Sequence, residues 1–117
     1  MTYRHFTTEE FKCRDCGRNE IKSEIIELLD RARALADVPF NISSGYRCPE
    51  YNAAVGGVED SAHTKGLAAD IKCLTSRARF KMIAALLECG FTRIGISDDF
   101  IHVDIDPDKP REVIWPY

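Results

Sequence analysis

A chain of 117 residues, of which 44% are hydrophobic, can build one compact domain with a core and is too short for two. Its 16 Lys and Arg residues against 19 acidic residues give a net charge of -3, and no basic block stands out. Because phosphate recognition depends on clustered Lys and Arg, this composition argues against nucleic-acid binding. We expect a single domain over residues 1–117.

The sequence shows no sign of an export or membrane segment. The N-terminal run MTYRHFTTEEFKC has no apolar stretch of the kind that secretory signals carry. No apolar run approaches the roughly 20 residues that a membrane helix needs. We therefore expect a chain that is synthesised in the cytoplasm without a signal peptide, is not inserted in a membrane, and is a monomer.

The N-terminal half is predicted to contain one long helix, short helical turns and a short strand. Thr7-Thr8-Glu9-Glu10 is a capping-box pattern that favours a short helix or turn. Between residues 23 and 36 apolar side chains recur at helical spacing, and Pro39 lies just beyond the end. Residues 41–46 are typical of a short strand and residues 49–55 of a helical turn.

The C-terminal half is predicted to combine strands with one long helix. A polar loop occupies residues 57–66, and Thr75 caps a helix that Gly90 closes. Its inner face is expected at Phe80, Ile83, Ala84 and Leu87. Strands are expected at residues 67–73, 92–96 and 100–105, and Trp115 is expected to anchor the tail in the core. This order predicts an α+β fold with a small antiparallel sheet flanked by helices.

A carboxylate, Asp70, stands inside the apolar run LAADI. Burying such a charge costs several kcal/mol, roughly, unless it is paired or bound to a metal. Strand alternation in FIHVDID places His102 and Asp104 on one face, and Asp70 would share that side if the two strands are neighbours. The alternatives are a salt bridge from Asp70 to Lys65 or Arg47, and a solvated outer face for His102.

A histidine in the preceding loop, His63, completes a candidate ligand set with Asp70 and His102. Two imidazoles and one carboxylate, with a fourth position left to water, are the pattern of catalytic zinc. A salt bridge would explain Asp70 but not His63. Asp99 is a candidate general base, or an ordinary turn aspartate. Arg47 is a candidate for holding a substrate carboxylate or an oxyanion, or an ordinary surface ion pair.

The odd number of cysteines favours reduced thiols. They are Cys13, Cys16, Cys48, Cys73 and Cys89. The last two lie in apolar surroundings and are expected to be small core residues. The CxxC pair Cys13 and Cys16 is half of a structural zinc site, for which Cys48 or His5 could supply a third ligand. A redox pair, or a turn with two buried thiols, are the alternatives.

Three segments together resemble one family. SGYRCPEYNAAVGG, SAHTKGLAADI and DDFIHVDID resemble the zinc D-alanyl-D-alanine carboxypeptidase family, which also holds dipeptidases and phage endolysins that cut peptidoglycan peptides. The resemblance runs from about Phe6 to Trp115. Its core is the pattern Ser-x-His-x-x-Gly-x-Ala-x-Asp, followed later by Asp-x-x-His and preceded by an arginine.

The resemblance implies a site and a fold. It implies that His63, Asp70 and His102 are the ligands of one Zn²⁺ ion. Asp99 would be the general base, and Arg47 would be a catalytic group that steadies the substrate or transition state. Ser61 and Tyr46 would line the substrate cleft, and Asp104 would orient a ligand histidine. The implied fold is the α+β one shared with Hedgehog-type domains, with the sheet as the floor of the cleft. Some members use glutamate as base where this chain has Asp99.

The implied function is that of a zinc-dependent metallopeptidase that hydrolyses peptidoglycan stem peptides, as an endolysin-like D,D-carboxypeptidase or endopeptidase. Asp99 would take the proton of the attacking water and return one to the leaving amine, while Arg47 would help to stabilise the oxyanion. The alternative is a non-catalytic zinc-bound module that binds cell wall or a partner, for which a base would be unnecessary. Action on the cell wall would need delivery by lysis or as part of a virion.

Overall fold

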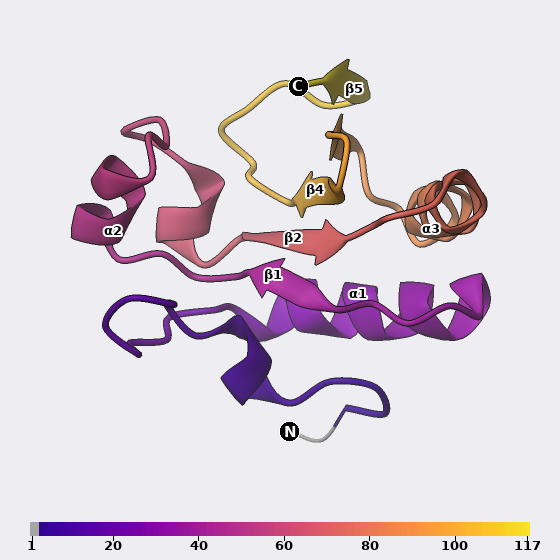
Figure 1. Cartoon of the computed structure of the whole chain (residues 1–117), viewed down its shortest axis with the longest axis horizontal. Helices are drawn as coiled ribbons and strands as arrows, with labels where there is room; N and C mark the ends of the chain where they lie inside the picture. The colour runs from indigo at the N-terminus through magenta and orange to yellow at the C-terminus, as the bar shows by residue number, and fades with distance from the viewer. Residues whose placement is uncertain (1–2) are drawn as a thin grey trace.

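The computed structural model describes residues 3–117, which form a five-stranded sheet with helices packed against it (Figure 1). Strands and helices alternate through most of the chain, as the sequence predicted. In order, the elements are the 3-10 helix η1 (Thr8–Phe11), α1 (Ser23–Ala36), β1 (Ile42–Ser44), α2 (Pro49–Ala54), the 3-10 helix η2 (Ala62–Lys65), β2 (Ala68–Lys72), α3 (Ser76–Glu88), β3 (Arg93–Ile96), β4 (Phe100–Asp104) and β5 (Val113–Pro116).

The sheet has the strand order β1-β2-β4-β3-β5. The first three pairings are antiparallel, whereas β5 runs parallel to β3 with Arg93 opposite Val113. The predicted α+β class with a helix-flanked sheet is confirmed. The sheet is mixed instead of wholly antiparallel, because the tail pairs with β3 as a strand that the sequence analysis had not predicted.

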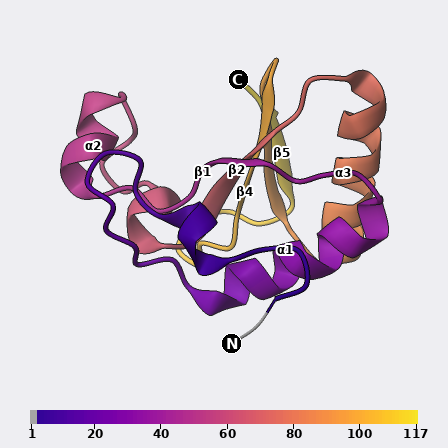
Figure 2. The ribbon, with the colours of Figure 1, turned by 60° about the horizontal axis from the view of Figure 1, so that its bottom comes forward.

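The core lies on one face of the sheet. Alternation along β2 and β4 turns Ile71 and Ile101 to that face, where they pack with buried side chains of both long helices, such as Leu29 of α1 and Leu86 of α3. Figure 2 shows α3 and α2 on opposite sides of the strands. The side chains that alternate with Ile71 and Ile101, among them Asp70 and His102, therefore project from the face away from this core.

Helix α1 begins and ends where the apolar periodicity predicted. Its C-cap, Asp37, has a left-handed φ of 56°, and its backbone N–H donates to the carbonyl of Arg33. The predicted capping box is also present at η1, where the backbone N–H of Thr7 donates to the Glu10 carboxylate at 2.7 Å.

The predicted inner face of α3 is wrong. Phe80 is 75% exposed and Leu87 is 49% exposed, Ala84 is exposed and Ile83 only partly buried. The buried face is instead made by Met82, Ala85 and Leu86, with Cys89 partly buried after them. Both stripes have the same spacing of three, one and three residues, so periodicity alone could not choose between them. The packing of α3 against α1 determines which stripe is buried.

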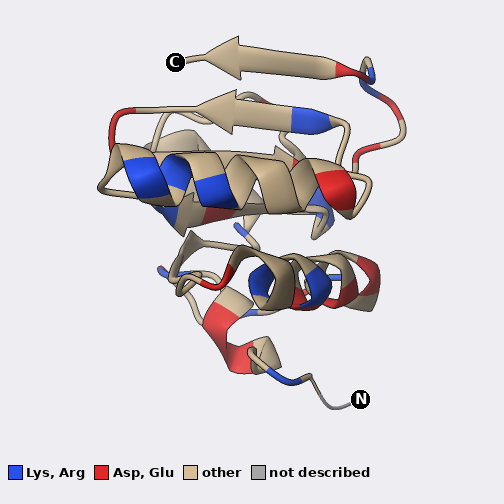
Figure 3. Cartoon of the chain, turned by 90° about the vertical axis from the view of Figure 1, so that its right-hand side faces the viewer, with Lys and Arg blue, Asp and Glu red and all other residues tan. Residues whose placement is uncertain are grey.

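In the part of the chain that the structure describes, no helix is both long and apolar enough to cross a membrane. Basic and acidic residues both occur along α1 and α3 (Figure 3). The outer surfaces of these helices therefore carry charges of both signs.

Candidate metal site and active-site cleft

The pairing of β2 with β4 brings the first two candidate ligands together. Asp70 lies directly opposite His102 in this antiparallel pair, so both side chains project from the face opposite the core. His63 enters from η2, which the chain leaves through Gly66 with a left-handed φ of 73°. A Cβ at Gly66 would collide with the backbone oxygen of Glu20, so only glycine fits this close approach.

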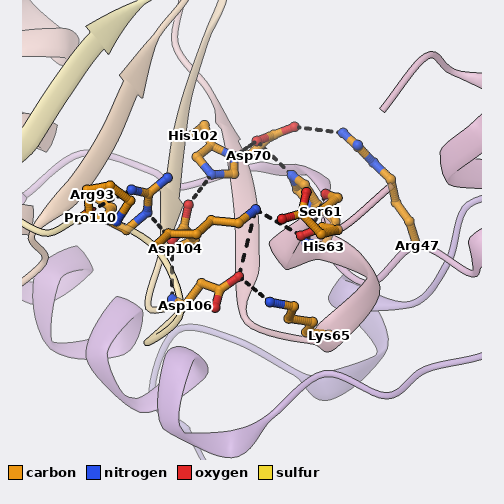
Figure 4. A network of polar contacts seen from close by, with 12 residues as sticks. Arg47, Ser61, His63, Lys65, Asp70, Arg93, His102, Asp104, Asp106 and Pro110 are labelled. Atoms are coloured by element: carbon orange, nitrogen blue, oxygen red, sulfur yellow. Dashed lines mark hydrogen bonds and ion pairs between the residues drawn. The ribbon is translucent and has the colours of Figure 1, made fainter. Parts of the chain in front are cut away.

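The three side chains converge on a single point (Figure 4). Nδ1 of His102 lies 3.0 Å from Oδ1 of Asp70, and Nε2 of His63 lies 3.3 Å from the same oxygen. Ligand atoms about 2.0–2.2 Å from a tetrahedral zinc ion are separated by roughly 3.3 Å. The two distances to Asp70 therefore fit a zinc site, and all three ligand atoms lie within 4.8 Å of one another.

The outer nitrogens of the two rings fix which inner nitrogen is free to bind. Nδ1 of His63 lies 2.7 Å from the carbonyl oxygen of Gly45, and Nε2 of His102 lies 2.7 Å from Oδ2 of Asp104. Both partners only accept hydrogen bonds, so those nitrogens carry the protons. In neutral rings, the nitrogens that face Asp70 then present lone pairs to a carboxylate oxygen. Three electron-pair donors pointing at one another require a positive charge between them.

Without a metal ion, that charge would have to come from protons. Burial raises the pKa of Asp70, but its contacts with His102 and His63 outweigh burial and hold this pKa far below its usual range. Burial lowers the pKa of His102, yet the carboxylates of Asp104 and Asp70 raise it on balance. The cluster is thus electrostatically built to hold a cation.

The salt bridge weighed for Asp70 exists alongside this arrangement. Arg47 approaches the second oxygen, Oδ2, at 3.4 Å, while the histidines face Oδ1. Lys65 does not reach Asp70, because it pairs with the buried carboxylate of Asp106 at 2.8 Å. Asp70 therefore has one oxygen for the arginine and one for a metal.

A cavity of about 410 Å³ opens over the cluster. Its lining includes Arg47, Ser61, Phe100, Trp115 and Tyr117. Trp115 therefore borders the cavity instead of anchoring the tail in the core, because β5 places it beside the sheet's polar face. Its ring lies 5.6 Å from that of His102, centroid to centroid.

The structure does not bring every predicted residue to the cavity. The hydroxyl of Tyr46 is buried and donates to the Glu20 carboxylate at 3.1 Å, away from the lining. Asp99 lies in the turn between β3 and β4 with an exposed side chain, also outside the lining. Ser61 does line the cavity, and its hydroxyl accepts from the backbone N–H of His63 at 3.2 Å.

Sequence reasoning missed two groups that hold the histidines, one directly and one through Asp104. Arg93 donates to Oδ1 of Asp104 at 2.7 Å and lies 4.9 Å from the ring centre of Trp115, so it fixes the carboxylate that orients His102. Strand alternation in RIGI could have suggested its face, although the pairing of β3 with β4 was needed to place it. The Gly45 carbonyl that holds His63 is a backbone group and has no sequence signal.

Comparison with known proteins gives a family for this chain. The model of the family described as Peptidase M15 matches residues 4–104, a range that contains all three converging side chains. A comparison with curated proteins returns no match. Peptidases of this family depend on zinc, which agrees with the donor set on the sheet. The chain belongs to the peptidase M15 family and is a zinc metallopeptidase.

Proposed function

We propose that this metallopeptidase hydrolyses peptide bonds of peptidoglycan stem peptides, as an endolysin-like D,D-carboxypeptidase or endopeptidase. His63, Asp70 and His102 are the proposed ligands of the catalytic zinc. The observation that carries the proposal is the convergence of these three electron-pair donors at the floor of a cavity with a basic wall. Access to the cell wall would come by lysis or from a virion.

The chain's own residues hold the ligands in place. When bound, zinc supplies a Lewis acid and a water molecule whose pKa is lowered to about 7. The Gly45 carbonyl fixes Nε2 of His63 as the ligand atom, and Asp104 fixes Nδ1 of His102. The cavity over these three side chains has room for a substrate carbonyl to approach them.

Arg47 is proposed to hold the substrate or its oxyanion. Its Nε donates to Ser44 at 3.2 Å and its Nη1 donates to Asn52 at 3.2 Å, so the guanidinium is held in one orientation beside Asp70. A fixed guanidinium suits a carboxylate or a developing oxyanion. Arg93 and Lys109 add positive charge to the lining, which with Arg47 outweighs the two carboxylates of Asp70 and Asp104 there. This basic wall supports a substrate with free carboxylates, as stem peptides have.

Asp99 is proposed as the general base. Support comes from its place three residues before His102 and from its exposed position next to Phe100, which lines the cavity. The role requires the turn between β3 and β4 to carry the carboxylate inward when substrate binds. The carboxylate would then take a proton from the attacking water and return one to the leaving amine.

A digestion experiment tests both the substrate and the base. Purified peptidoglycan is incubated with the zinc-loaded protein, and the released fragments are weighed by mass spectrometry to identify the bond cut. We expect Asp99→Asn to lower the rate by about 10²-fold or more, because general-base catalysis contributes that much. Asp98→Asn, in the same exposed turn, is the matched control and should keep the wild-type rate.

The two parts of the proposal fail separately. If the zinc-loaded wild type releases no new fragments, peptidoglycan is not the substrate. If fragments appear at equal rates with wild type and Asp99→Asn, the substrate stands and Asp99 is not the base.

A further inference from the structure

A second group of metal-ligand side chains lies outside the cavity. The sulfur atoms of Cys13, Cys16 and Cys48 lie within 4.8 Å of one another. Cys13 and Cys48 are buried, whereas Cys16 is exposed, and none of the three lines the cavity. The sequence left Cys48 and His5 open as the third ligand beside Cys13 and Cys16. The structure places Cys48 in the group, whereas the backbone N–H of His5 donates to Asp30.

The backbone around this group is folded to hold a thiolate. The N–H of Cys48 donates to the sulfur of Cys13, and the N–H of Tyr51 donates to the sulfur of Cys48, each at 3.4 Å. Gly17, with a left-handed φ of 77°, closes the CxxC turn, and its N–H donates to the Cys13 carbonyl. Backbone N–H groups directed at sulfur stabilise its charged form.

Backbone N–H groups and neighbouring thiols act in opposite directions on two of these thiols. Burial raises the pKa of Cys13, but backbone N–H groups of Cys16, Cys48 and Asp15 outweigh burial and lower it to about 7. The Tyr51 N–H lowers the pKa of Cys48, yet burial and the neighbouring thiols raise it to about 11. Thiolate sulfurs this close together repel one another, and a metal ion bound between them would offset that repulsion.

Few apolar side chains pack around the three cysteines. The satellite core around the cysteines contains only two further side chains, Tyr46 and Tyr51, and residues 12–22 form neither a helix nor a strand. All five cysteines are free, so no disulfide ties the segment down. Small clusters of this kind commonly depend on a metal or another cross-link for stability.

We propose that Cys13, Cys16 and Cys48 bind a second metal ion, a thiophilic divalent cation such as Zn²⁺. Three thiolates fill three tetrahedral positions, and the fourth falls to water on the exposed side at Cys16. We assign the site a structural role despite its open fourth position, because it lies outside the cavity and joins the N-terminal loop to the segment that ends at Cys48. It does not rest on the proposed action on peptidoglycan.

The second site would also steady the active site. The N–H of Tyr46 donates to the carbonyl of Phe11, and the N–H of Arg47 donates to the carbonyl of His63. Gly45 in the same segment holds the ring of His63. A metal at Cys48 therefore fixes one end of the segment that positions both Arg47 and a catalytic zinc ligand.

Metal content tests this proposal directly. Protein purified with reductant and zinc should contain two zinc ions per chain by elemental analysis. Cys16→Ser should lose one of them and Asp70→Asn should lose the other. Cys16 is exposed, so its replacement leaves no cavity in a core. Cys89→Ser, outside the group, is the matched control and should keep both ions.

Cobalt substitution provides a readout that is independent of zinc counting. Thiolate ligands give bound Co²⁺ a charge-transfer absorption in the near ultraviolet, whereas histidine and carboxylate ligands do not. Wild type and Asp70→Asn should both show this band, and the Cys13→Ser, Cys16→Ser double variant should lack it. A wild type with one metal ion per chain and no such band would overturn the second site while leaving the peptidase proposal intact.

Discussion

Asp70 shows how one side chain can serve two purposes. It is 6% exposed in an otherwise apolar strand, where an unpaired charge would cost several kcal/mol, roughly. Arg47 faces one of its oxygens, and the two histidines face the other. The apolar neighbours that make the charge expensive also keep water from competing with the ligand. The same burial therefore explains both the need for a partner and the fitness of the site for a metal.

Asp104 is predicted to raise zinc affinity without contacting the ion. Its Oδ2 accepts from Nε2 of His102 at 2.7 Å, which makes the ring a better electron-pair donor and fixes its orientation. In Asp104→Asn, we expect zinc to bind the cavity site about 10- to 100-fold more weakly. Competition against a fluorescent zinc chelator measures this change.

The exposed Asp108, in the loop after β4, provides the matched control for Asp104. Asp108→Asn removes the same charge nearby and should leave the zinc affinity within about twofold of wild type, as expected for a surface substitution. Equal affinities for wild type and Asp104→Asn would show that Asp104 does not act through His102.

At the scale of elements, the helix α3 carries two apolar stripes of equal spacing, and only one is buried. Leu86 is fully buried and Leu87, the next residue, is 49% exposed. We expect Leu86→Ala to lower the free energy of unfolding by about 2–5 kcal/mol, because it leaves a cavity in the core. Leu87→Ala should cost less than about 1 kcal/mol.

Denaturant unfolding followed by circular dichroism compares these two leucine variants on one helix. The pair controls for helix propensity, since both changes replace Leu by Ala at neighbouring positions. If Leu87→Ala proved the more damaging, the other stripe would face the core.

The elements that alternate or repeat could be predicted from sequence, and those defined by long-range pairing could not. Apolar periodicity predicted both ends of α1. Strand alternation predicted that Asp70 and His102 share one face if their strands are neighbours, and the two strands do pair. The face of α3 and the strand β5 depend on which surfaces meet in three dimensions. The family resemblance implied Tyr46 for the cleft and Asp99 as general base, and the structure places both side chains outside the cavity lining.

At the scale of the molecule, one sheet separates two kinds of surface. Its apolar face packs on α1 and α3, and its polar face carries the ligands and the cavity. The parallel strand β5 brings Trp115 and Tyr117 into the cavity wall. At the other end of the chain, Phe11 and Cys13 accept hydrogen bonds from the backbone N–H groups of Tyr46 and Cys48, just before α2. The C-terminal strand thus lines the cavity directly, whereas the N-terminal loop contacts the segment that holds His63 and Arg47.

Metal binding should therefore stabilise the whole fold. The ligands of each proposed site come from distant parts of the chain, so the unfolded chain does not present them together and the native state binds the metal preferentially. Free zinc at about 100 times its Kd should add about 2.7 kcal/mol for each site. Calorimetry of the chelator-treated protein should show the unfolding temperature rising by about 10 °C or more when zinc is restored.

Variants assign this stabilisation to its sites. Asp70→Asn and Cys16→Ser should each keep only part of the zinc-dependent rise, and the double variant should lose almost all of it because both ligand sets are incomplete. Mg²⁺, which prefers hard oxygen ligands in octahedral geometry, should not replace zinc in the wild type. If zinc does not change the unfolding temperature of the wild type, both sites are contradicted. If the double variant keeps the full zinc-dependent rise, the ion binds elsewhere in the chain.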